Sequence, residues 1–110
     1  MMSGWFELRK NSGGTWRLRL KAADAQTLLD TGVYPDRGAA ESAIASFREN
    51  CAHEERYVRR IDSSGKNYFK LRCVRKEIIA RSHLYDSEST LQQAIETIMR
   101  VGQTQVVKEA

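Results

Sequence analysis

The sequence has few residues that cross-link or bend a chain and no segment that could anchor it in a membrane. It contains one proline, two cysteines and no long apolar run. No stretch approaches the roughly 18 consecutive apolar residues typical of a membrane-spanning helix. Residues 1–7 lack a basic region followed by an apolar segment, so we expect no secretory signal. From these absences we expect a cytoplasmic protein with no membrane partner.

Cysteine usage argues against a metal centre. Cys51 and Cys73 belong to no CxxC motif, and although His53 and His83 lie near them in sequence, zinc sites use tighter, paired spacings. We expect reduced thiols that act as small buried hydrophobic residues. No GxxxxGK or GxGxxG segment follows the glycines either, so the sequence predicts no metal and no cofactor.

No block of like charges occurs, but the charge is unevenly divided. The chain of 110 residues has 18 Lys and Arg against 14 Asp and Glu, a net charge of +4. Residues 1–51 contain seven basic and six acidic residues, whereas residues 52–110 contain eleven and eight, so the second half carries most of the excess. The apolar fraction of 41% is ordinary for a globular chain, and this length predicts one domain over residues 1–110.

The strongest pattern is an internal repeat with an offset of 51 residues. Residues 16–51 align without a gap on residues 67–102. Apolar positions coincide first through a segment of period two and then through a segment of period 3.6, and chance would not keep both in register. The matched pairs include Leu18 with Phe69, Leu20 with Leu71, Leu28 with Ile79, Tyr34 with Tyr85, and Phe47 with Ile98.

Each copy predicts three strands and then a helix. Period-two alternation places strands at residues 5–10, 16–21 and 27–33, and again at 56–61, 68–73 and 78–84. Ala40, Ile44, Phe47 and Cys51 form a helical stripe, which is repeated around Leu91 and Ile98. Asp36 and Ser87, equivalent in the two copies, are the expected N-caps, and residues 104–108 are expected to form a last strand.

We therefore predict an α+β fold made of two tandem β-β-β-α-(β) repeats, at about residues 4–54 and 55–108. They form one antiparallel sheet with two helices packed on one face. No linker separates the copies, so we expect one fused core.

The segment Leu20–Leu28, with Thr31, Tyr34 and Ala43–Asn50, resembles the repeat of the YegP-like family of small bacterial proteins of unknown function. The resemblance covers nearly the whole chain. It implies a β(3)-α-β unit in duplicate, with terminal strands exchanged between the halves, and homodimers for single-repeat members. It implies no catalytic or binding residue.

Two turns depart from the family pattern. Asp24-Ala25 and Arg75-Lys76 stand where the family usually has Asn-Gly. Alanine and lysine resist the positive φ that a two-residue primed turn requires, so these substitutions argue against a tight primed hairpin at both places.

The feature with functional content is the outward face of the predicted sheet. Basic residues share the strand parity that points away from the helices, and aromatic residues are interleaved with them. Such a face suits single-stranded nucleic acid or another polyanion, whereas an uncovered antiparallel sheet would carry solvated polar residues in any case. The possible polyanion-binding residues are Arg17, Arg19, Lys21, Arg60, Tyr68, Lys70 and Arg72, with Arg9 and Trp5 on the same face.

No catalytic constellation is present. His53 and His83 belong to no nucleophile motif, and Glu54-Glu55 is a short acidic pair that we interpret as solvated. We therefore expect no enzyme but a binding or scaffold module whose partner is another protein, with nucleic-acid or polyanion binding as the alternative. Because both repeats lie in one chain, we expect a monomer.

Overall fold

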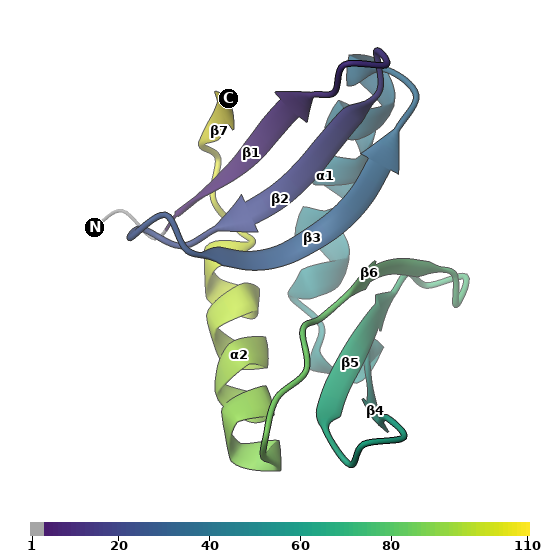
Figure 1. The fold of residues 1–110 in the computed structure, drawn as a ribbon, viewed down its shortest axis with the longest axis vertical. Helices are drawn as coiled ribbons and strands as arrows, with labels where there is room; N and C mark the ends of the chain where they lie inside the picture. Colours follow the sequence, from purple (N-terminus) through teal and green to yellow (C-terminus); the bar gives the residue numbers. More distant parts are fainter. Residues whose placement is uncertain (1–3) are drawn as a thin grey trace.

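The computed structural model describes residues 4–110 (Figure 1). Both copies contain the predicted three strands and one helix, and a short 3₁₀ turn, η1, links the copies. The elements are β1 (Trp5–Lys10), β2 (Trp16–Lys21), β3 (Thr27–Tyr34), α1 (Arg37–Cys51), η1 (Glu54–Arg56), β4 (Tyr57–Ile61), β5 (Asn67–Arg72), β6 (Ile78–Arg81), α2 (Glu88–Val101) and β7 (Val107–Glu109).

The described strands form one sheet in the order β4-β5-β6-β3-β2-β1-β7. Each copy contributes an antiparallel meander, and the two meanders meet where β3 and β6 pair antiparallel at Asp30 and Arg81. These two residues are 51 positions apart, so the pair joins one repeat position to its own equivalent. Self-pairing of equivalent positions is what a local two-fold axis produces. The fold class is the α+β class predicted from the sequence.

One edge of the sheet differs from the expectation of purely antiparallel pairing. β7 runs parallel to β1, with Phe6 opposite Val107 and Leu8 opposite Glu109, so the sheet is mixed. The reason lies in where the chain leaves α2. The Thr104 hydroxyl donates to the Gly4 carbonyl at 2.9 Å and the Phe6 amide to the Val106 carbonyl at 3.0 Å, so the tail reaches β1 at its start and then follows it.

Strand exchange between the halves, which the family resemblance implies, occurs here in one direction. β7, from the second copy, completes the sheet beside β1 of the first. The repeat equivalent of Val107–Glu109 is residues 56–58, where β4 itself begins. One segment cannot be both an added strand and β4, so within residues 4–110 no strand lies against the outer edge of β4.

Both helices pack on one face of the sheet, as predicted (Figure 1). α1 contacts β2, β3 and also β5, whereas α2 contacts β5 and β3, so each helix bridges the two copies. Asp36 and Ser87 cap the helices as expected, by accepting from the amides of Ala39 and Thr90. The buried core is drawn from both copies and includes Phe6, Leu8, Leu18, Leu20, Leu29, Ile44, Phe47, Phe69, Leu71, Leu91, Ile95, Ile98 and Val101.

All four hairpin turns share one geometry. Gly14, Ala25, Gly65 and Lys76 have φ values of 89°, 72°, 86° and 68°. In each turn the amide of this residue donates to the carbonyl three positions earlier, at 2.8 to 3.0 Å. This is the three-residue hairpin loop in which a turn is followed by a left-handed residue. The two-residue primed turn is therefore absent at Ala25 and Lys76, but the positive φ is kept without glycine.

We expect Ala25→Gly and Lys76→Gly each to raise the free energy of unfolding by about 0.5–1 kcal/mol, because glycine adopts the left-handed conformation without its steric cost. Urea denaturation followed by circular dichroism measures the change. Ala23→Gly, in the first of these turns but without positive φ, is the control and should not stabilise. Equal effects at Ala23 and Ala25 would contradict the explanation.

Candidate functional site

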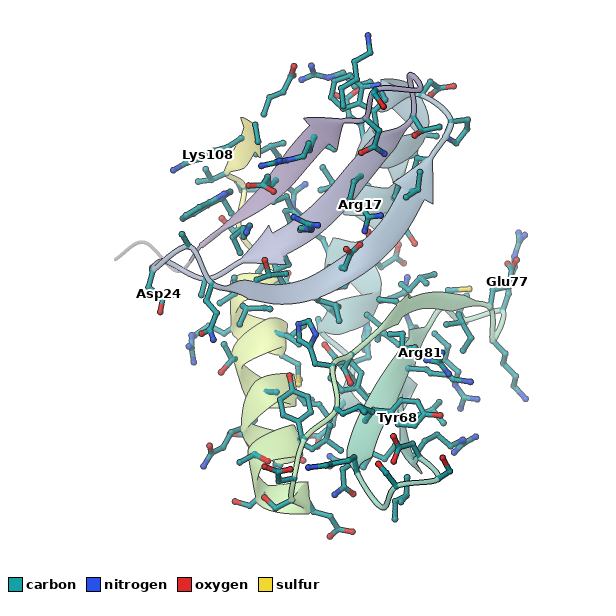
Figure 2. The ribbon with its side chains drawn as sticks, in the orientation of Figure 1. Arg17, Asp24, Tyr68, Glu77, Arg81 and Lys108 are labelled. Carbon is teal, nitrogen blue, oxygen red and sulfur yellow. The ribbon has the colours of Figure 1, made fainter. Side chains whose placement is uncertain are left out.

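The seven sequence-predicted residues lie on the face of the sheet that points away from the helices. In the first half, Arg17, Arg19 and Lys21 alternate with buried Leu18 and Leu20. In the second half, Tyr68, Lys70 and Arg72 alternate with buried Phe69 and Leu71, and Arg60 lies opposite Tyr68 across the β4–β5 ladder. Arg9 and Trp5 share the face through their pairing with Arg17 and Lys21. The structure divides these residues into two groups on either side of the β3–β6 join (Figure 2).

The first-half group is engaged within the molecule. Asp30 Oδ2 lies 2.6 Å from Arg17 Nη1 and 3.4 Å from Arg19 Nε. Lys21 Nζ donates to Thr27 Oγ1 at 2.8 Å, and Glu7 is the cross-strand partner of Arg19. A polyanion would have to displace Asp30 from Arg17 and Arg19, so the acids of this half neutralise part of its charge.

The aromatic ring of the first half is also occupied. The Lys108 ammonium, on β7, lies 4.1 Å from the centroid of the Trp5 ring. An ammonium at this distance interacts with the face of the indole, so that face is not available for a base to stack on.

The second-half group has a different environment because Arg81 occupies the position equivalent to Asp30. The Arg81 guanidinium lies 5.2 Å from the Tyr68 ring centroid. Arg60 donates to the backbone carbonyl of Arg59 at 3.0 Å. Among residues 4–110, no carboxylate forms an ion pair with Lys70, Arg72 or Arg81. We call Arg60, Tyr68, Lys70, Arg72 and Arg81 the basic patch.

Two apolar side chains border the basic patch. Ile78, opposite Arg72 in the β5–β6 ladder, is 53% exposed, and Leu84 is 54% exposed. Leu84 lines a surface depression together with Tyr68, Arg81, Ser82 and Asp62. The sequence expectation did not include Arg81, Ile78 or Leu84. Comparing Asp30 with its repeat equivalent would have pointed to Arg81.

The one carboxylate in this depression serves its own turn. Asp62 accepts from the Ser64 hydroxyl at 2.7 Å and from the backbone amides of Ser64 and Lys66. These donors, the Ser64 hydroxyl first, hold the pKa of Asp62 below its usual value. Asp62 is therefore ionised at neutral pH, and its Oδ1 already accepts three hydrogen bonds.

No cysteine or histidine belongs to the basic patch, although Cys73 directly follows Arg72 and His83 lies between Ser82 and Leu84. Cys51 is fully buried, as predicted, but Cys73 is only half-buried, because β5 ends at Arg72 and Cys73 begins the following turn. His53 and His83 are exposed. Within residues 4–110 no three His, Cys, Asp or Glu side chains are grouped to hold a metal ion, and no helix is both long and apolar enough to cross a membrane.

Comparison with known proteins identifies the family of this chain. The model of the "Domain of unknown function (DUF1508)" matches the chain twice, at residues 11–57 and 62–109. The chain belongs to this family. It is 38% identical to the UPF0339 protein YegP of Escherichia coli (strain K12) over 108 residues, which is 98% of each chain. It is 32% identical to a UPF0339 protein of Shewanella oneidensis, again over 98% of each chain.

Solved structures agree with the fold. The solution NMR structure of the E. coli protein yegP, described as a protein of unknown function, matches 99% of this chain and 94% of its own with a TM-score of 0.89. The solution NMR structure of UPF0339 protein SO3888 from Shewanella oneidensis matches 98% and 92% with a TM-score of 0.88. The family resemblance found in the sequence and the two tandem repeats are thereby confirmed.

We expect Asp30→Asn to lower the free energy of unfolding by about 0.5–1 kcal/mol, because it removes a pair of partly exposed ion pairs. The asparagine can still accept from the Gly32 amide, which now donates to Oδ1. The loss, measured by urea denaturation, should shrink in 1 M salt. Glu49→Gln removes an exposed carboxylate with no ion pair among the described residues and is the control; equal losses at both sites would contradict the role of Asp30.

Alkylation should distinguish the two thiols. Burial raises the pKa of Cys51 to about 11, so at pH 8 this thiol is protonated as well as enclosed. We expect iodoacetamide at pH 8 to modify Cys73 many times faster than Cys51, as measured by mass spectrometry of the two peptides. In urea the rates should converge. Rapid native modification of Cys51 would show that the core around it opens.

Proposed function

We propose that this protein is a non-enzymatic binding module, monomeric and cytoplasmic, that holds an acidic segment of another protein on the basic patch. The observation that carries the proposal is the exchange of Asp30 for Arg81 at equivalent repeat positions. It leaves Lys70, Arg72 and Arg81 without an ion-paired carboxylate among residues 4–110. An acidic segment of a partner would supply the missing negative charge.

Composition favours a protein partner. The basic patch combines arginine and tyrosine with exposed Ile78 and Leu84 at its border. Arginine and aromatic residues are enriched at protein interfaces, where they supply both area and hydrogen bonds. Tyr68 is half-buried and the Arg81 guanidinium lies against its ring, so the patch presents a shaped, partly apolar surface.

A second candidate function is polyanion binding, and the observation in its favour is the pair Lys70 and Arg72. Both lie on β5, two residues apart, and neither has a carboxylate partner among the described residues. Phosphates could bind there. Nucleic acid would also need stacking platforms, and the two on this face, Trp5 and Tyr68, are covered by Lys108 and Arg81. This is why we place protein first.

The repeat provides a matched test. Lys70→Gln with Arg72→Gln neutralises the basic patch, and Arg19→Gln with Lys21→Gln makes the same change at the equivalent first-half positions. The probe is a synthetic peptide of alternating glutamate and leucine, titrated by isothermal calorimetry and by amide NMR. We expect the patch variant to weaken binding about tenfold and the first-half variant by less than about twofold.

The outcomes separate the candidates. A 12-nucleotide single-stranded DNA and polyphosphate are titrated beside the peptide at two salt concentrations. Peptide shifts on β5 and β6 that survive physiological salt support the protein partner. Tighter binding of the polyanions, with a steep salt slope, would favour the second candidate. Equal weakening by both double variants would refute a role special to the basic patch.

A further inference from the structure

The outer edge of β4 is the repeat equivalent of an edge that is occupied in the first half. β1 is covered by β7, whereas β4 pairs only with β5 among the described residues. In the first half the Phe6 amide donates to the Val106 carbonyl, and the Ala110 amide donates to the Leu8 carbonyl at 2.8 Å. The equivalents of Phe6 and Leu8 are Tyr57 and Arg59, so their backbone groups point toward the open edge.

Most of this edge is available for pairing. The Tyr57 amide donates to the Glu54 carbonyl within η1, which closes the start of the edge. Alternation along the strand directs the amides of Arg59 and Ile61 the same way, outward, because the Asp62 amide turns inward to the Lys66 carbonyl. An incoming strand would therefore find free donors over the second part of β4.

A pocket accompanies the open edge. It has a volume of about 370 Å³ and is lined by Arg59, Arg60, Ile61, Asn67, Glu88 and Leu91. The first-half equivalent of Asn67 is Trp16, and the equivalent of Glu88 is Arg37. There the Arg37 guanidinium lies 5.5 Å from the Trp16 ring centroid and pairs with Glu109 of β7. The first half thus fills this place with an indole and an added strand, and the second half, with the shorter Asn67, leaves it open.

The tail of a second copy does not fit the open edge. It already pairs with β1 of its own chain, and in the β7 register its Glu109 would lie beside Glu88, where the first half has Arg37, as well as opposite Arg59. Pairing of two β4 edges would bring Arg59 and Arg60 of both copies together. Exposed basic residues on an edge strand oppose such self-association. The tail that is already paired and the basic residues of the edge therefore point to a different molecule.

We propose that the β4 edge binds an extended peptide segment of another protein as a parallel added strand, with an aromatic side chain in the pocket beside Asn67. In the β7 register, the peptide residue opposite Arg59 contacts Glu88 and is basic, because Arg59 itself already pairs with Glu54. The next residue, opposite Arg60, is acidic, and the aromatic residue follows opposite Ile61. Main-chain hydrogen bonds provide affinity and the pocket provides specificity. This surface lies at the edge and toward α2, and it shares only Arg60 with the basic patch.

The test uses the full chain and the peptide acetyl-Thr-Val-Thr-Lys-Asp-Trp-Thr-amide, titrated by amide NMR. We expect shifts at residues 59–61 and 88–92. Asn67→Trp fills the pocket as Trp16 does in the first half and should weaken binding about tenfold, a loss typical of one aromatic anchor. The double variant Lys70→Gln with Arg72→Gln should bind this peptide as the unmodified protein does, which separates this proposal from the function proposed above.

A charge-swap experiment distinguishes the loss of a specific contact from misfolding of the variant. Glu88→Arg should weaken the lysine peptide, and replacing that lysine by glutamate should restore binding, because it recreates the Arg37–Glu109 pair. A peptide N-methylated at alternate residues should not bind, since it cannot donate to the edge. Absence of shifts on β4, failure of the swap to rescue, or dimerisation through β4 in sedimentation would each overturn the proposal.

Discussion

The pairing of Asp30 with Arg81 joins the two copies of the repeat into one sheet. β3 and β6 join at this single pair of partners, and the two residues occupy equivalent positions of the repeat. One pair contributes little by itself, so the continuous sheet depends on what crosses the join elsewhere. α1 contacts β5, α2 contacts β3, and β7 returns to β1. The copies are therefore held together by a shared apolar core and one exchanged strand.

The same pair of positions explains the electrostatic difference between the two halves. Asp30 brings a carboxylate to Arg17 and Arg19, whereas Arg81 adds a cation beside Tyr68. A single exchange of sign at a symmetric position gives two arginines of one half a carboxylate partner and adds a cation to the other half. A second asymmetry follows from the end of the chain. Within residues 4–110, α2 is followed by a segment that is not part of the next copy, so β1 gains an added strand whereas β4 keeps an open edge.

Much of the fold follows from local pattern. The apolar stripe through Ile44 and Phe47, the N-caps at Asp36 and Ser87, and the strand alternation around Leu18 and Phe69 all form as the residues predict. Each depends on interactions within a few residues or on one buried face, and both copies of the repeat carry the same pattern. The parallel direction of β7 could not be predicted from local pattern, because it depends on where the chain lies when it leaves α2.

The candidate site was predictable in part for the same reason. Strand parity placed the basic residues on the outward face, but parity does not reveal which cations meet a carboxylate. The sequence by itself determined the repeat, the elements and the two sides of each strand, because periodicity reports burial along one segment. Only the tertiary structure decided that Asp30 reaches Arg17 and Arg19, that Arg81 joins Tyr68, and that no strand among residues 4–110 covers the outer edge of β4. These depend on strand order and register between segments far apart in the chain, which no local pattern encodes.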